Sequence, residues 1–341
     1  MNSTYPLVSV LTPVYNGEQY LAECIESVIN QKYSNWEYII VNNCSTDRTI
    51  EIALEYAKKD SRIRVENNRK FVCCEENHNI AFRLISNESK YCKVVSSDDV
   101  IFPDCIKKLV EVAEKNKTIG FVGSYQLSGG GDNWSIKWVG LPYTTTIVPG
   151  HSICRWHLLG RPYVFGTPTS VLYRSDITRK TSSFFPNLGP HGDTSTFYKY
   201  LDSCDFGFVH QVLSYERIHE KAMSSRGIKI DTYRSAYLDD LIEYGPKYLT
   251  NNELKNRISA RMNDYYDSLA SGFVNFKDKE YWEYHKNRLY QLGLPFSYSK
   301  FYMHLWLKLM DLALNPKQSI KKLVNAYSQS ISILGRKIHV K

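Results

Sequence analysis

The chain has 341 residues, of which 43% are hydrophobic and 23% are charged, an ordinary composition for a soluble globular protein. This length predicts one large α/β domain with an extension. The net charge is +8, yet residues 300–341 hold eight basic residues and one acidic residue, so this tail carries +7 and the rest of the chain +1. A nearly neutral body without a basic stripe excludes nucleic acid as a partner.

The chain shows neither targeting nor metal-binding patterns. Residues 1–6 lead directly into an apolar segment, and no apolar run is long enough to span a bilayer, so we expect neither a signal peptide nor a transmembrane helix. None of the eight cysteines falls in a CxxC pair, which favours reduced, mostly buried thiols over a zinc site. These features predict a cytoplasmic protein.

The first hundred residues alternate between predicted strands and helices. We expect strands over residues 7–12, 36–41, 63–65 and 91–95, and helices over residues 18–31, 50–57 and 77–86. This β-α-β-α order predicts a parallel sheet with crossover helices. No GxGxxG follows the first strand and no GxxxxGK[ST] is present, which disfavours a dinucleotide-binding fold and a P-loop.

Polar residues follow three of these strands, namely Thr12-Pro13, Asn42-Asn43 and Asp98-Asp99. The carboxyl ends of parallel strands share one edge of the sheet, where ligands bind in open α/β folds, so we expect a nucleotide cleft there. Two adjacent carboxylates after a buried strand suit a divalent metal and a diphosphate. The alternative is a solvated turn that caps the helix following Pro103.

Further polar positions stand near element ends in the second half. Asp193 lies where a helix would begin, which suits either an N-cap or a general base beside a cleft. Arg217 and His219 follow a strand predicted over residues 208–215, and an arginine and a histidine at one strand end suit a diphosphate.

Three other segments are notable: a glycine-rich stretch, a group of tryptophans and an apolar stretch near the C-terminus. Residues 128–132 are rich in glycine, which predicts a flexible loop. The tryptophans that follow either pack on the sheet or stack on sugar rings; they are Trp134, Trp138 and Trp156. Residues 301–310 are apolar and aromatic within the basic tail, which suits a helix in an anionic membrane surface or a helix packed on the catalytic body.

Residues 6–225 resemble the family 2 glycosyltransferases of the GT-A fold. The resemblance is carried by SVLTPVYNG at residues 9–17, EYIIVNNCSTDRT at residues 37–49 and SSDD at residues 96–99. It implies a three-layer α/β/α sandwich with a helical C-terminal extension. The glycosyltransferase domain would occupy residues 1–228, with a nucleotide-binding half at about 1–103 and an acceptor half at about 104–228. The helical extension would occupy residues 229–341.

The resemblance also implies an activity: inverting transfer of a sugar from a nucleotide-diphosphate donor, here a UDP-sugar, in cell-surface polysaccharide synthesis. The acceptor would be a hydroxyl of a glycan or of a polyprenyl-diphosphate-linked oligosaccharide. The implied contacts to the nucleobase and ribose come from Thr12, Pro13, Tyr15 and Asn43. The implied diphosphate contacts come from Asp98 and Asp99, and the implied ligands of Mn²⁺ or Mg²⁺ are Asp98, Asp99 and His219. The implied catalytic base is Asp193. Residues 300–341 would hold the enzyme peripherally on the cytoplasmic face of the inner membrane.

This sequence departs from the family pattern at named positions. Asn42-Asn43 replace paired acids, which removes a carboxylate contact to a uracil ring. Ser96 replaces the first acid of the metal motif, and Gly192 stands where a glutamate usually precedes the base. Two other interpretations remain. A sugar-nucleotide nucleotidyltransferase usually carries a Gly- and Arg-rich loop after the first strand, unlike this chain, and a non-catalytic sugar-nucleotide-binding scaffold would need neither acidic site.

Overall fold

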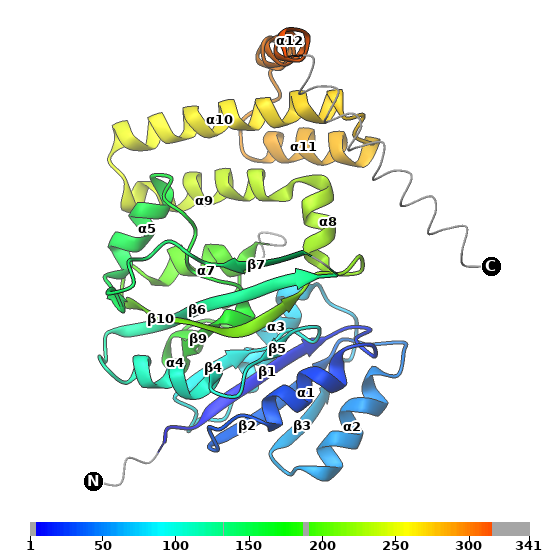
Figure 1. Cartoon of the computed structure of the whole chain (residues 1–341), viewed down its shortest axis with the longest axis vertical. Helices are drawn as coiled ribbons and strands as arrows, with labels where there is room; N and C mark the ends of the chain where they lie inside the picture. Colours follow the sequence, from blue (N-terminus) through cyan, green and yellow to red (C-terminus); the bar gives the residue numbers. More distant parts are fainter. Residues whose placement is uncertain (1–4, 132, 187–190, 316–341) are drawn as a thin grey trace, which may run out of the picture. The chain divides into compact units, whose positions relative to one another are not determined.

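The computed structural model describes residues 5–131, 133–186 and 191–315. The chain divides into two compact units. The first unit consists of Met1–Ala236 and Asp240–Arg257, and the second of Tyr237–Asp239 and Ile258–Lys341. Figure 1 labels the elements of both units. The domain boundary expected between residues 228 and 229 stays a prediction.

The first unit contains a ten-stranded mixed sheet whose main order is β3-β2-β1-β4-β9-β6-β10-β5, with β7 beside β6 and β8 beside β10. Its strands are β1 Val8–Val14, β2 Trp36–Asn42, β3 Ile63–Asn67, β4 Tyr91–Val94, β5 Val100–Ile101, β6 Ile119–Gly130, β7 Asn133–Lys137, β8 Ile147–Val148, β9 Val171–Arg174 and β10 Asp205–Arg217. The first four pair in parallel, as predicted, because each crossover is helical.

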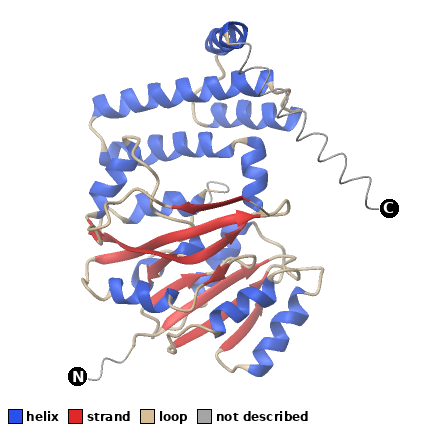
Figure 2. Cartoon of the chain, in the orientation of Figure 1, coloured by secondary structure: helices blue, strands red, loops and turns tan. Residues whose placement is uncertain are grey.

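Helices cover both faces of this sheet (Figure 2). The helices of the described chain are α1 Leu21–Ile29, α2 Thr49–Lys59, α3 Cys74–Arg83, α4 Cys105–Ala113, α5 Gly150–Leu158, η1 Pro168–Ser170, α6 Ser175–Thr178, α7 Gly192–Tyr200, α8 Met223–Ile230, α9 Thr232–Tyr248, α10 Asn251–Val274, α11 Lys279–Gln291 and α12 Tyr298–Leu314. The three helices predicted in the first hundred residues are confirmed as α1, α2 and α3.

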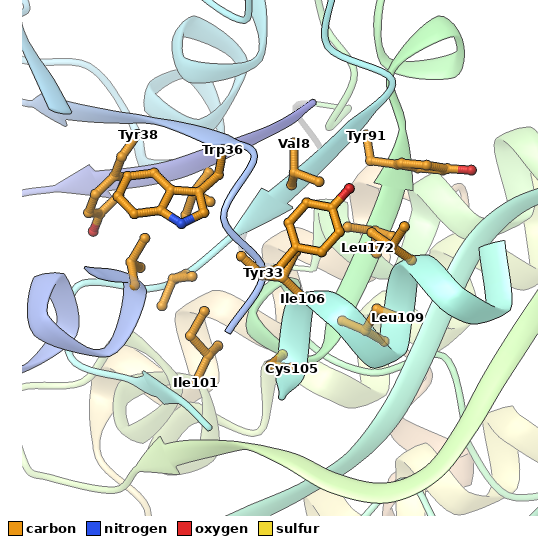
Figure 3. Close-up of a cluster of buried hydrophobic side chains, with 14 of the residues drawn as sticks. Val8, Tyr33, Trp36, Tyr38, Tyr91, Ile101, Cys105, Ile106, Leu109 and Leu172 are labelled. Atoms are coloured by element: carbon orange, nitrogen blue, oxygen red, sulfur yellow. The ribbon is translucent and has the colours of Figure 1, made fainter. Parts of the chain in front are cut away.

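Two neighbouring residues of β9 pack into different hydrophobic layers, one on each face of the sheet. Leu172 of β9 joins the cluster formed with α1, α2 and α4, and Figure 3 shows it with Val8 and Leu109. Tyr173, the next residue, packs against Phe82 of α3 with ring centroids 5.7 Å apart. Because successive strand residues point to opposite faces, each face has its own helical layer. The predicted three-layer α/β/α arrangement is confirmed.

Residues 128–130 of the glycine-rich segment are strand rather than the predicted flexible loop, Gly131 is a turn residue with φ +60°, and residue 132 lies outside the described residues. β6 continues to Gly130 and pairs with β7, so that Gly129 lies opposite Trp134. A Cβ atom at Gly129 would lie 2.7 Å from the Trp134 ring, and one at Gly130 would lie 2.4 Å from the Ile218 carbonyl oxygen. Glycine is needed at positions 129 and 130 because other atoms approach the backbone closely, and at position 131 because the turn that follows β6 gives it a positive φ.

The second unit is helical in the part that the structure describes, which ends at residue 315. Its core consists of Leu238, Met262, Tyr265, Tyr266, Leu269, Ala270, Tyr281, Leu289, Phe301 and Leu305. Within residues 5–131, 133–186 and 191–315, no helix has the length and apolar character needed to cross a membrane. Five of the eight cysteines are buried: Cys24, Cys92, Cys105, Cys154 and Cys204.

Candidate functional site

The carboxyl ends of β1, β2 and β4 meet at one edge of the sheet. The amide of Asn43 donates to the Val14 carbonyl at 2.9 Å, and the Thr12 hydroxyl donates to the Val95 carbonyl at 2.8 Å. Thr12 and Pro13 are buried, and the Thr12 hydroxyl also lies 2.8 Å from the Tyr38 hydroxyl. Thr12 therefore fixes the end of β1 from inside the sheet, and Pro13 is buried beside it.

The exposed part of this edge is aromatic. Tyr15 is 49% exposed and Phe71 is 61% exposed, and their ring centroids lie 4.9 Å apart in an edge-on arrangement. Phe71 was not among the predicted site residues, because one aromatic residue in a polar loop gives no periodic signal. Two exposed rings at a strand end can contact a flat ligand such as a nucleobase.

Asn43 holds the loop that carries Phe71. Its Oδ1 accepts hydrogen bonds from the amide of Val72 and from Nδ2 of Asn68, both at 3.0 Å. Its Nδ2 donates to the Val72 carbonyl at 2.9 Å, and Asn68 also donates to Asn77 at 2.8 Å. A carboxylate could not donate to Val72, which gives a structural reason for an amide at this position.

Asp99 is a buried carboxylate with protein partners. It accepts hydrogen bonds from the Thr169 hydroxyl at 2.6 Å and from the Arg217 amide at 3.1 Å. Burial, followed by the charge of Asp98, raises the pKa of Asp99 well above its ordinary value. Helix α4 has Asp104 as its N-cap, so neither Asp98 nor Asp99 caps it and the capping part of that alternative is wrong.

Asp98 is more accessible and faces His219. Its Oδ2 lies 3.0 Å from His219 Nε2, with the aspartate side chain 30% exposed. The Arg217 guanidinium donates to the Asp98 carbonyl at 3.1 Å and lies over the Tyr20 ring, 4.5 Å from its centroid. The structure thus brings together the three predicted metal-site residues, since Asp99 is bound to the amide of Arg217 two positions before His219.

A buried lysine lies beneath this cluster. Lys93 of β4 is fully buried, and its Nζ donates to the carbonyls of Val94 and Val171, at 3.2 and 3.3 Å, and of Thr169. Burial lowers the pKa of Lys93 to about 8. A lysine inside an otherwise apolar strand was the available signal, and the prediction of site residues made no use of it.

Asp193 has a different environment. It is the second residue of α7, whose N-cap position is His191, so the N-cap alternative is wrong. Its Oδ1 accepts from the amide of Thr194 at 2.9 Å. Burial raises the pKa of Asp193 to about 6, and the charges of Glu75 and Glu216 contribute in the same direction.

Gly192 and Glu216 complete this part of the site. A Cβ atom at Gly192 would lie 2.5 Å from the Pro186 carbonyl oxygen, which explains why a glycine precedes Asp193. Glu216, at the end of β10, raises the pKa of both Asp99 and Asp193 by like-charge repulsion. Its role was missed because only the fold brings it near both carboxylates.

A cavity of about 120 Å³ lies in the segment between β7 and η1. Trp156 lines it together with His157 and Arg161, and the Arg161 guanidinium lies 4.9 Å from the centre of the Trp156 ring. Trp134 packs against Tyr215 with ring centroids 5.3 Å apart. The Trp138 indole donates to Gln126 at 3.0 Å, so this ring is held in place by protein contacts.

The chain matches the family described as "Glycosyl transferase family 2" over residues 9–181. Bacillus subtilis TuaG, described as a putative teichuronic acid biosynthesis glycosyltransferase, is 37% identical over 128 residues, which are 36% of this chain and 48% of TuaG. The matches to the first curated relatives span 36% and 48% of those proteins.

Two solved structures share the fold. S. aureus TarS residues 1–349 in complex with UDP-GlcNAc has a TM-score of 0.64 at 17% identity, with 92% of each chain covered. The mannosyltransferase PcManGT from Pyrobaculum calidifontis, in complex with GDP-Man and Mn²⁺, has a TM-score of 0.52 at 14% identity, with 90% of this chain and 89% of that chain covered. The GT-A fold is thereby confirmed. Because the family match covers half of the chain in the part that carries the strand-end residues, the protein belongs to glycosyl transferase family 2.

Proposed function

We propose that this protein transfers a sugar from a nucleotide-diphosphate donor to an acceptor hydroxyl with inversion at the anomeric carbon. The observation that carries the proposal is the contrast between two acidic positions of one unit. Asp98 and Asp99 lie among hydrogen-bond donors. The carboxylate of Asp193 accepts from a neighbouring backbone amide and has a pKa of about 6, which suits a proton acceptor at neutral pH.

The donor is proposed to be a UDP-sugar. Support comes from TarS, which shares the fold and binds UDP-GlcNAc. Tyr15 and Phe71 would contact the nucleobase, since both rings are exposed at the strand ends. Thr12, Pro13 and Asn43 would shape the nucleobase and ribose site, Thr12 and Asn43 through their contacts with β4 and the Phe71 loop.

The diphosphate would be bound at Asp98 and Asp99 together with Mn²⁺ or Mg²⁺. The described residues hold no group of three or more His, Cys, Asp or Glu side chains that would bind a metal alone. That arrangement fits these ions, which are typically bound by one or two carboxylates and completed by substrate phosphates. Asp98 and Asp99 would hold the ion together with the donor phosphates, with His219 beside Asp98 at 3.0 Å, and PcManGT, with Mn²⁺ in its complex, supports a metal at this position. When bound, it would neutralise charge on the leaving diphosphate.

Asp193 would act on the acceptor. Its carboxylate would remove the proton from the attacking hydroxyl as the new glycosidic C–O bond forms and the bond to the diphosphate oxygen breaks. Attack from the face opposite the leaving group inverts the anomeric carbon, through oxocarbenium-like character as in glycoside hydrolysis. General-base assistance of this kind contributes roughly 10²–10⁴-fold.

The acceptor is proposed to be a glycan or a polyprenyl-diphosphate-linked oligosaccharide in surface polysaccharide synthesis, which the TuaG description supports. Catalysis is assigned to residues 1–228, with donor and acceptor halves at about 1–103 and 104–228, and membrane-facing functions to residues 229–341. The protein would work in the cytoplasm, peripherally on the inner membrane. Residues 316–341 of the proposed membrane segment lie outside the described residues.

A thermal-shift screen with UDP-, GDP- and TDP-sugars, each with Mn²⁺ or EDTA, tests the donor site. A ligand at 100 times its Kd stabilises by about 2.7 kcal/mol, so a metal-dependent rise in Tm with one nucleotide class is expected. Donor hydrolysis in the same samples then separates an enzyme from a binding scaffold. A Tm rise without turnover in the presence of acceptor glycans contradicts the transferase proposal, and no Tm rise with any donor contradicts the donor site.

A further inference from the structure

Helix α12 uses only a narrow side of its surface to pack within its unit. Phe301 and Leu305 are its buried residues. The Phe301 ring lies 5.7 Å from the rings of Trp282 and Phe296 and 6.1 Å from that of Phe273. These contacts hold α12 on the helical core of the second unit.

A broad side of α12, beginning next to its packed residues, is apolar and exposed. Seven large apolar residues are between 39% and 73% exposed: Tyr302, Met303, Trp306, Leu307, Leu309, Met310 and Leu314. With ~100° between successive residues, these positions and Tyr298 cover about half of the circumference. We call this surface the apolar arc. Soluble monomers rarely expose so continuous an apolar surface without a partner.

Charged residues are excluded from the apolar arc. The charged residues of α12 are Lys300, Lys308 and Asp311, and at ~100° per residue they fall on the remaining part of the circumference, between the arc and the packed side. Lys308 lies 3.7 Å from Asp267 of α10, and Asp311 accepts from Asn315 at 2.8 Å. The sequence therefore places an apolar face beside a polar margin.

We propose that the apolar arc of α12 lies in the interface of an anionic lipid surface. The charge balance supports lipid over a second protein chain, because residues 300–341 hold eight basic residues and one acidic residue, and basic segments are attracted to anionic headgroups. Tyr and Trp side chains favour the membrane interface, where one end of the ring system is apolar and the other hydrated.

The length of the helix supports an interfacial position. A 17-residue helix is about 26 Å long, shorter than the roughly 30 Å hydrocarbon core. An apolar face together with a basic segment gives the two contributions that stable peripheral binding requires. The inference deepens the proposed function by naming the surface that would bring the enzyme to a lipid-linked acceptor, but lipid binding itself is measured without catalysis.

The test is co-sedimentation of the full chain with phosphatidylcholine vesicles, with and without phosphatidylglycerol. We expect binding to the anionic vesicles that weakens with salt. The double variant W306S/L307S removes two exposed apolar side chains and should lower the partition coefficient by about tenfold or more. A second variant, M303S/L314S, should do the same. Both keep Phe301 and Leu305, so the Tm should stay unchanged.

Tyr290→Ser is the matched control, because Tyr290 of α11 is 78% exposed and lies outside α12. It should leave the partition coefficient unchanged. Equal sedimentation of wild type and both α12 variants overturns the inference, as does wild type that stays in the supernatant. A solution dimer that the α12 variants dissociate, without vesicle binding, identifies a second copy as the occupant and also overturns it.

Donor hydrolysis in the same samples separates this inference from the proposed function. We expect both α12 variants to hydrolyse a soluble donor at the wild-type rate, because the substitutions lie outside the strand-end site. Vesicle binding without any donor turnover supports the α12 inference and contradicts the transferase proposal. Turnover without vesicle binding does the reverse.

Discussion

Two acidic positions of the same unit differ in how the protein surrounds them. The carboxylates of Asp98 and Asp99 lie close to a hydroxyl, a backbone amide and an imidazole. Asp193 lies at the start of α7 and accepts from the next backbone amide. Burial raises the pKa of both Asp99 and Asp193. The two positions differ in their partners, because Asp99 is held by the Thr169 hydroxyl and the Arg217 amide. Asp193 instead accepts from the next backbone amide and has a pKa near the pH at which a base must work.

The largest expected effect comes from Asp193→Asn, which removes the proposed base while keeping the size of the side chain. We expect kcat to fall by roughly 10²–10⁴-fold or more, with the donor-induced Tm shift nearly unchanged. Kinetic assays and thermal shift on one sample measure both. Wild-type turnover would show that Asp193 is not the base.

The same variant tests the electrostatic side of the comparison. The folded-state pKa of Asp193 is raised to about 6, so its contribution to stability is present below the unfolded pKa and is lost as pH rises through about 6. Replacing the ionised carboxylate by a neutral amide should therefore raise the free energy of unfolding at pH 7 by about 1–2 kcal/mol, and by much less near pH 4. Denaturant unfolding at the two pH values checks this.

Asp98→Asn should act on binding. Loss of a charge-assisted contact of roughly 1.5–3 kcal/mol should raise the donor KM by about 10–100-fold in Mn²⁺. In EDTA the variant and the wild type should bind the donor equally weakly, and this provides the internal control. A KM that stays at the wild-type value in Mn²⁺ would remove Asp98 from the donor site.

Thr169→Val tests how the fold holds Asp99. The change removes the hydroxyl that donates to this buried carboxylate, so we expect a loss of about 1–3 kcal/mol in the free energy of unfolding. Thr118→Val is the control, since the Thr118 hydroxyl pairs with Asp205 at an exposed position and should matter by less than about 1 kcal/mol. Equal effects of the two changes would contradict the account of Asp99.

The smallest effect is expected from Glu216→Gln. In the wild type, kcat/KM should rise with pH around a midpoint near 6, because Asp193 must be ionised to accept a proton and its pKa is about 6. Removing the charge of Glu216 should move this midpoint slightly to lower pH, since like-charge repulsion decreases. A pH–rate profile of both proteins measures it, and a midpoint that moves upward would contradict the proposed tuning.

Local sequence patterns were sufficient for much of the fold. Strands and crossover helices repeat with clear periods, so the parallel pairing of β1, β2, β3 and β4 could be predicted, but not their order in the sheet. The flexible loop predicted over residues 128–132 is wrong for residues 128–130, which are strand, because a glycine run indicates backbone freedom but not the Trp134 ring packed against Gly129. Close approach between distant atoms leaves no periodic trace in a sequence.

The site was predicted less completely for the same reason. Thr169 contacts Asp99 across 70 positions of sequence, and Glu216 acts on Asp99 and Asp193 only because β10 crosses the same sheet. Similarly, the apolar pattern of α12 predicted its helix but could not tell which side packs and which is exposed. That choice depends on the aromatic rings of α11 and its flanking loop.

The Asn43, Asn68 and Asn77 hydrogen bonds give the Phe71 loop a neutral support. Amides do not titrate in the physiological range, whereas the carboxylates usual in this family would carry charge into the proposed nucleobase site. The nucleobase contribution to affinity should accordingly be the same in acidic and alkaline medium and nearly independent of ionic strength. An enzyme built this way would recognise its donor constantly while its turnover follows the acidity of the surroundings.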